Sequence, residues 1–192
     1  MTVFSLDDIL SEIEEVLTGE RTEPDDEEDE DTPPFHVDVK SKADELISDI
    51  IAHIDGEQFE DLVAAVLRAM NYEAQTTSGG ADHGVDVIAH PDSFGFNDPL
   101  IKAQVKHRSS KTGSGDIRDF IGTLGNDEKG LFVSTGGYTS SAQEEAERTD
   151  HRVTLIDRDD FVDLLLDHYE ELETEYTNLV PLKRVYVPTE GA

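Results

Sequence analysis

The chain has 192 residues, with 45 Asp and Glu against 15 Lys and Arg, which gives a formal net charge of −30. This length suits one compact domain with an appendage, and the absence of cysteine excludes disulfides, thiolate metal sites and cysteine nucleophiles. No run of about 18 apolar residues occurs, and the first twenty residues carry acids where a signal peptide carries bases. We therefore expect a cytoplasmic protein with no membrane partner.

The excess of acid has two competing interpretations. The chain either avoids or mimics nucleic acid, or it comes from a high-salt cytoplasm, where charges are screened over about 3 Å at 1 M salt. The acids are spread over nearly every segment, and Cys and Trp are missing. This composition is typical of haloarchaeal proteins and favours the second interpretation.

Residues 1–18 are expected to form an N-terminal helical extension. Apolar residues from Ile9 to Leu17 recur at helical spacing, and an amphipathic helix of this kind needs a partner surface. Residues 19–34 hold nine acids and three prolines, so we predict a disordered acidic linker over 19–40. The alternative is that the acidic segment mimics DNA and occupies a binding cleft.

A regular pattern begins at Ser41 and predicts one domain over 41–176. Two helical stripes are followed by three short strands and then by alternating helices and strands. The expected fold is α/β, a central mixed sheet flanked by helices on both faces. Residues 177–192 are assigned to a C-terminal tail or edge strand. The predicted elements are two helices with apolar stripes over 43–54 and 59–70, strands 72–77, 84–89 and 100–107, helix 115–124, strand 130–134, helix 139–149, strand 152–156 and helix 158–170.

The segment LIKAQVKH at 100–107 carries the first chemical signal. Because side chains alternate along a strand, Lys102, Gln104 and Lys106 share the face opposite to the apolar residues. Gln104 and Lys106 are then about 6.6 to 7 Å apart, where both could meet one phosphate. In GVDVIA, Asp86 projects with Ile88, so pairing of the two strands would bring Asp86 to Gln104 and Lys106.

These residue types suit metal-assisted hydrolysis of a phosphodiester. Mg²⁺ prefers oxygen ligands and keeps several waters, so Asp86 and Gln104 would suffice as protein ligands, and Mn²⁺ could replace it. Lys106 would orient the attacking water and offset charge on the phosphate. Glu60, on the preceding helix beside Phe59, could supply another carboxylate.

Six blocks in a fixed order now point to a known family. FEDLVAAVLRAMNY, GGADHGVDVIA, AQVKH, IRDFIGTL, LFVSTGGYTSSAQEEAE and VTLIDRDDFVDLL resemble the Mrr-type restriction endonuclease domain of the PD-(D/E)xK superfamily, over about 55–172. The resemblance implies a restriction-endonuclease-like core and Mg²⁺-dependent cleavage of double-stranded DNA. It places the motif on Glu60, Asp86, Gln104 and Lys106, with Asp82 and Gly84 in the turn that presents Asp86.

The sequence departs from this pattern at two positions. Gln104 stands where the wider superfamily has Asp or Glu, although Mrr-like members have Gln here, and a neutral amide should raise the Mg²⁺ requirement. His83 occupies a turn position that is usually smaller in the family.

A basic window lies directly beyond the proposed catalytic strand. Residues 101–118 contain five of the fifteen bases and a single acid, and KHRSSKTGSG also offers hydroxyls and backbone N–H groups for phosphate contacts. The loop STGGYTSS at 134–141 lacks the lysine of a nucleotide-binding P-loop, but its N–H groups could hold a DNA phosphate. The candidate DNA-binding residues are Lys102, His107, Arg108, Lys111, Arg118, Ser134 and Thr135.

Two classes of function remain open at this point. The first is a metal-dependent endonuclease of a restriction or defence system. The second is a DNA-binding or assembly module that keeps the nuclease fold with weak catalysis, and Gln104 and the excess of acid favour it. Cutting both strands needs two active centres, for which a homodimer is the simplest arrangement. The histidines show no zinc-ligand spacing.

Overall fold

The computed structural model describes residues 35–184, apart from 78–83 and 98. The expected N-terminal helix, residues 19–34 of the expected linker, and the turn residues Asp82 and His83 lie outside this part of the chain.

Two helices lead into the sheet. The first, α2, spans Phe35–His53, and the second, α3, spans Gly56–Ala69. Because α2 begins at Phe35, residues 35–40 are helical and do not belong to a linker. The acidic run ends at Asp31, and a proline immediately before a helix is compatible with its first turn. Asp55 begins α3, and its carboxylate accepts a hydrogen bond from the Gln58 N–H at 2.8 Å.

The sheet has five strands in the order β1-β2-β3-β4-β5, so each strand pairs with the one before it in the sequence. The β1-β2 and β2-β3 pairs are antiparallel, and the β3-β4 and β4-β5 pairs are parallel. The predicted meander followed by βαβ connections is therefore confirmed. The strands are β1 Glu73–Thr76, β2 Val87–His90, β3 Ile101–Lys106, β4 Lys129–Ser134 and β5 Arg152–Ile156.

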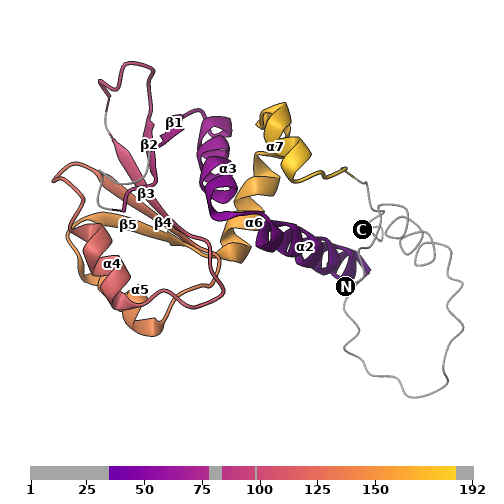
Figure 1. Ribbon diagram of the computed structural model, residues 1–192, viewed down its shortest axis with the longest axis horizontal. Helices are drawn as coiled ribbons and strands as arrows, with labels where there is room; N and C mark the ends of the chain where they lie inside the picture. Colours follow the sequence, from indigo (N-terminus) through magenta and orange to yellow (C-terminus); the bar gives the residue numbers. More distant parts are fainter. Residues whose placement is uncertain (1–34, 78–83, 98, 185–192) are drawn as a thin grey trace, which may run out of the picture. The chain divides into compact units, whose positions relative to one another are not determined.

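Helices cover both faces of this sheet, as the sequence predicted (Figure 1). On one face, α4 (Ser114–Ile121) and α5 (Ser140–Arg148) enclose a small core that includes Phe120 and Phe132. On the other, α2, α3 and α6 (Arg158–Asp167) enclose a larger core around Phe59 and Phe161. Two short elements follow, the 3-10 helix η1 (Tyr169–Glu171) and α7 (Thr174–Leu179).

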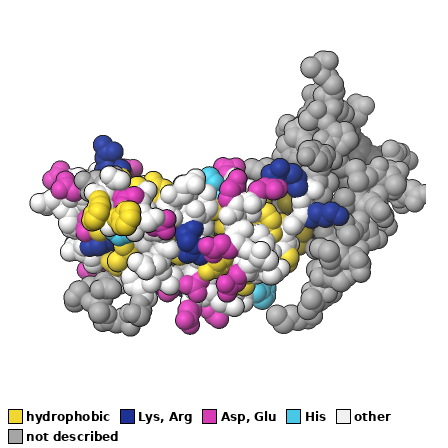
Figure 2. All heavy atoms as spheres, turned by 90° about the horizontal axis from the view of Figure 1, so that it is seen from above, with side chains coloured by type: hydrophobic (Ala, Val, Ile, Leu, Met, Phe, Trp, Pro, Cys, Tyr) yellow, Lys and Arg dark blue, Asp and Glu magenta, His cyan; other side chains and the backbone are white. Residues whose placement is uncertain are grey.

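The C-terminal segment is not a strand where the structure describes it. Residues 177–179 belong to α7 and residues 181–184 are irregular, so the described part of 177–192 is not an edge strand. At the turn between β2 and β3, Phe94 and Phe96 are 80% and 85% exposed, and their rings stack with centroids 5.7 Å apart. Hydrophobic side chains are visible at the left of Figure 2, the side on which this turn lies in Figure 1. No described helix is long and apolar enough to cross a membrane.

Candidate active site

Asp86 lies immediately before β2, where β2 and β3 separate. Its N–H donates to the Ala103 carbonyl at 2.8 Å, and its Oδ2 accepts the Val105 N–H at 2.7 Å. The carboxylate thus takes the place that a strand carbonyl would occupy, whereas the sequence pattern placed Asp86 within the strand. One carboxylate oxygen is fixed by β3, and the other makes no hydrogen bond to a described residue.

Gln104, on β3, is nearly buried, with 8% of its surface exposed. Its amide end lies against Gly84, where a Cβ would come 2.6 Å from the Gln104 Nε2. Gly84 also has a φ of +93°, a conformation that side chains with a Cβ rarely adopt. The positive φ therefore favours glycine at this position, two residues before Asp86, and the Gln104 amide lies directly against it.

Glu60 is close enough to Asp86 and Lys106 for their charges to affect it. Burial raises the pKa of Glu60, the charge of Asp86 and two acids of α3 raise it further, and Lys106 lowers it. Burial also raises the pKa of Asp86, and the hydrogen bond from Val105 and the charge of Lys106 oppose that effect only in part. Both carboxylates are therefore less stable in their ionised forms, and a cation between them would stabilise those forms.

The donors at this point suit a hard divalent cation. Two carboxylates and an amide offer oxygen ligands, and Mg²⁺ is commonly held by one or two carboxylates with water completing its octahedron. Within the described ranges, no group of three His, Cys, Asp or Glu side chains could hold a metal by itself. A metal here would therefore depend on Glu60, Asp86, the Gln104 oxygen and water.

His107 points inward and not into the basic loop. Its Nε2 donates to the Ile54 carbonyl at 3.0 Å, and its ring packs on Phe59 with centroids 4.7 Å apart. The other ring nitrogen, Nδ1, is buried and has no hydrogen-bond partner in the described part of the chain. The sequence placed His107 among the DNA-binding residues, and the structure places it between β3 and the start of α3.

The candidate basic residues differ in what they are bound to. Lys102 forms an ion pair of 2.7 Å with Glu128 and donates to the Thr123 carbonyl at 2.9 Å. Two further 2.7 Å ion pairs join Arg108 to Asp116 and Arg118 to Glu145. Lys111 is exposed, and no ion pair with it is found among the described residues. Lys111 is thus the member of the basic window whose charge is most open to a partner.

Ser134 and Thr135 hold two loops together. Ser134 is fully buried, and its hydroxyl pairs with that of Thr112 at 2.8 Å. The Thr135 hydroxyl accepts the Arg108 N–H at 3.1 Å. These contacts fix the loop after β3 onto the loop after β4. Both hydroxyls therefore have partners within the protein, and Ser134 is not at the surface.

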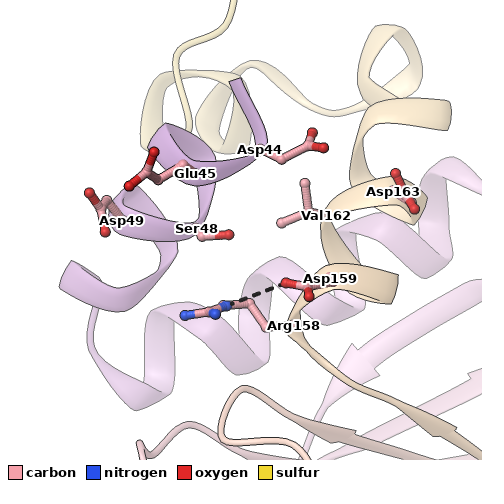
Figure 3. A pocket seen from close by; sticks show the side chains of 8 residues that line it. All are labelled: Asp44, Glu45, Ser48, Asp49, Arg158, Asp159, Val162 and Asp163. Carbon is pink, nitrogen blue, oxygen red and sulfur yellow. Dashed lines mark ion pairs between the residues drawn. The ribbon is translucent and has the colours of Figure 1, made fainter. Parts of the chain in front are cut away.

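A separate groove of about 560 Å³ lies between α2 and α6 (Figure 3). None of the candidate catalytic residues lines it. Its walls are mostly acidic, with one base, Arg158, which pairs with Asp159 at 3.7 Å. This charge would repel DNA phosphates, so the groove is not part of the candidate site. The lining residues are Asp44, Glu45, Ser48, Asp49, Arg158, Asp159, Val162 and Asp163.

Two contacts that build the site were not predicted from the sequence. The Val105 N–H that holds Asp86 belongs to a residue assigned only to the core, and the approach of Gly84 to Gln104 joins two separate motifs. The glycine two residues before an acid at the start of a strand could have indicated the second contact. The first contact could not be predicted, because its donor is a backbone N–H, which the type of side chain does not reveal.

Comparisons with known proteins give a consistent result. The Mrr_cat family model, described as a restriction endonuclease, matches residues 51–165. The chain is 26% identical over 133 residues to the type IV methyl-directed restriction enzyme EcoKMrr of Escherichia coli K12, covering 66% of this chain and 42% of that protein. It is 31% identical over 101 residues to the uncharacterized protein y4cE of Sinorhizobium fredii, covering 50% of this chain and 26% of that one.

Solved structures of restriction endonucleases share the fold. The modification-dependent enzyme AspBHI gives a TM-score of 0.57 at 20% identity, over 84% of this chain and 43% of that one. MspJI in complex with an oligonucleotide gives 0.52 at 16% identity, over 84% and 40%. The chain thus spans less than half the length of these relatives. Its mixed sheet between two helical layers is a restriction-endonuclease-like α/β fold, and the chain belongs to the Mrr_cat family of restriction endonuclease domains.

Proposed function

We propose that this chain is a metal-dependent DNA endonuclease of the PD-(D/E)xK type, acting in restriction or defence. The observation that carries the proposal is that Glu60, Asp86 and Lys106 lie close enough for their charges to interact, and that burial raises the pKa of both carboxylates. Membership of a restriction endonuclease family supports it.

Asp86, Glu60 and the amide oxygen of Gln104 would hold Mg²⁺, with Mn²⁺ as a substitute. The bound ion would lower the pKa of a water and stabilise the leaving oxygen. The Val105 N–H holds Asp86 in a fixed orientation, so one of its oxygens stays directed at the site. Lys106 would orient the attacking water and offset charge on the phosphate. A 5′-phosphate product would follow from attack of that kind in this superfamily.

Double-stranded DNA would approach along the loop that follows β3. Lys111 and Arg108 lie on this loop, which Ser134 and Thr135 clamp to its neighbour. A net charge of −30 fits a high-salt cytoplasm. Since high salt removes much of the gain from counterion release, DNA binding would depend on preorganised contacts. We further propose that a homodimer supplies two active centres and that the N-terminal helix binds a partner protein.

EcoKMrr is described as methyl-directed and AspBHI as modification-dependent. Modified DNA is therefore the first substrate to test. The experiment compares supercoiled plasmid with and without methylation in molar KCl, with Mg²⁺, Mn²⁺ or EDTA, for the wild type and the variants Asp86→Asn and Lys106→Ala. Metal-dependent nicking or linearisation that both variants lose would support the proposal.

One observation favours a second function. Gln104 supplies an amide where a third carboxylate would bind metal more strongly, and such a site suits a DNA-binding or assembly module with weak catalysis. This alternative predicts DNA binding by a folded protein with no turnover at any metal concentration. That result in the plasmid assay would overturn the endonuclease proposal.

A further inference from the structure

His107 joins two segments that carry the candidate catalytic residues. It directly follows Lys106 at the end of β3, and its Nε2 donates to the carbonyl of Ile54 at 3.0 Å. Ile54 lies in the corner between α2 and α3, immediately before the capping residue Asp55. The hydrogen bond therefore ties the catalytic end of β3 to the start of α3.

A second contact of the same ring reaches the first turns of α3. The imidazole packs on Phe59 with centroids 4.7 Å apart, and Phe59 is fully buried against Phe161. Phe59 directly precedes Glu60. The two contacts thus hold residues 54 and 59 against the strand that carries Lys106, and Glu60 is the next residue along.

Packing alone does not account for a histidine here. Nδ1 is buried without a partner among the described residues, and leaving a buried polar atom unpaired is unfavourable. A phenylalanine would fill the same space against Phe59 without that cost. What the imidazole adds is the Nε2 donor to Ile54.

We propose that His107 is a positioning residue, which sets Glu60 against Asp86 and Lys106 through the Ile54 carbonyl and makes no contact with DNA. This rests on the proposed metal-dependent function. Small displacements matter at such a site, because partners that orient metal ligands affect metal affinity or activity by about 10- to 100-fold.

Two substitutions separate the two contacts. His107→Phe keeps an aromatic ring on Phe59 and removes the donor, whereas His107→Gln keeps an N–H donor and removes the ring. Lys111→Ala is the matched control, a nearby base on the loop with no such tie. Metal binding is read without turnover, by electron paramagnetic resonance of Mn²⁺ added to the full chain in molar KCl. DNA affinity is measured with Ca²⁺, and the melting temperature reports folding.

We expect His107→Phe to weaken Mn²⁺ binding about tenfold and to leave DNA affinity within about twofold of the wild type. His107→Gln should recover most of the loss. In a Glu60→Gln background, His107→Phe should have no further effect on Mn²⁺ binding, because the residue acts through Glu60. Lys111→Ala should change DNA affinity and leave Mn²⁺ binding unchanged.

Other results would overturn the inference. A lower melting temperature with unchanged Mn²⁺ affinity would mean that His107 only packs, and weaker DNA binding with unchanged Mn²⁺ affinity would make it a DNA contact. A wild type that binds no Mn²⁺ would also overturn it. If the wild type binds Mn²⁺ but cuts no plasmid, the endonuclease proposal fails, and the Mn²⁺ series still decides the role of His107.

Discussion

The charges beside α4 and those at the end of β3 have opposite environments. Beside α4, acids from distant segments pair with Lys102 and Arg118, and the hydrogen bond from Arg118 lowers the pKa of Glu145. At the end of β3, burial raises the pKa of Glu60 and of Asp86, and Lys106 only partly opposes it. The fold neutralises the first group within itself. The second group is not neutralised in this way, and the proposed metal ion would supply the missing positive charge.

The comparison also assigns the two groups to different tasks. A paired surface charge contributes little to stability and is not available to a ligand. A buried carboxylate held ionised beside another one reduces stability, and such groups are common at functional sites. Four predictions test this distinction.

The largest effect is expected for Asp86→Asn. Asparagine keeps an oxygen that can accept the Val105 N–H, so the local fold should survive, but the charge that would hold the proposed cation is lost. We expect cleavage to fall by roughly 1000-fold or more, in line with the loss of a group that stabilises charge in the transition state. Initial rates of plasmid nicking measure it. Activity within tenfold of the wild type would remove Asp86 from the site.

Gln104→Glu should add negative charge near the end of β3 and so increase the difference between this region and the paired charges beside α4. A carboxylate in place of the amide adds a charged oxygen ligand beside Asp86 and Glu60. We expect the Mg²⁺ concentration for half-maximal cleavage to fall by about tenfold, the size typical of a change in the immediate surroundings of a metal. Gln104→Ala is the control and should raise that concentration. If both variants behave alike, the side chain does not contact the metal.

The basic window can be divided by comparing Lys111→Gln with Lys102→Gln. Lys111 is exposed, whereas Lys102 is bound to Glu128 and Thr123. Loss of one phosphate contact should reduce the salt slope of DNA binding by about one for Lys111→Gln. Lys102→Gln should leave both affinity and slope nearly unchanged. Binding titrations at several salt concentrations measure this, and a larger effect for Lys102 would reverse the assignment.

The smallest effect concerns stability without metal. Because folding raises the pKa of Glu60, the folded state binds this proton more tightly than the unfolded state does, and stability falls as pH rises through the raised pKa. Glu60→Gln should therefore melt slightly above the wild type at pH 7.5. The difference should vanish below the ordinary Glu pKa of about 4.3, and also on adding Mg²⁺. A variant less stable at pH 7.5 would contradict this.

Much of the fold follows from the sequence because its elements are strongly periodic. The stripe from Phe59 to Met70 and the alternation in IKAQVK mark α3 and β3, and the ordered motifs predicted that Glu60, Asp86 and Lys106 lie near one another, as their charge interactions indicate. Asp86 itself was placed inside a strand, because alternation does not reveal where a strand begins to pair. That boundary depends on a backbone bond to Val105.

The DNA-binding residues are harder to predict, since charge was counted along the sequence and not in space. Glu128 neutralises Lys102 and Glu145 neutralises Arg118, each from more than twenty residues further along the chain. Ser134 looked accessible in a loop rich in hydroxyls, yet its partner Thr112 encloses it. Partners of this kind are set by tertiary packing.

The order of the sheet has a consequence for how the protein forms. Since every strand pairs with its predecessor, each new strand can add to an edge that already exists as the chain leaves the ribosome. Glu60, Asp86 and Lys106 are all synthesised before β4 begins, whereas Phe161, which packs on Phe59, comes later. Synthesis of α6 should therefore be the event that makes the site rigid, and nascent chains that end before it should be cut readily by proteases near α3.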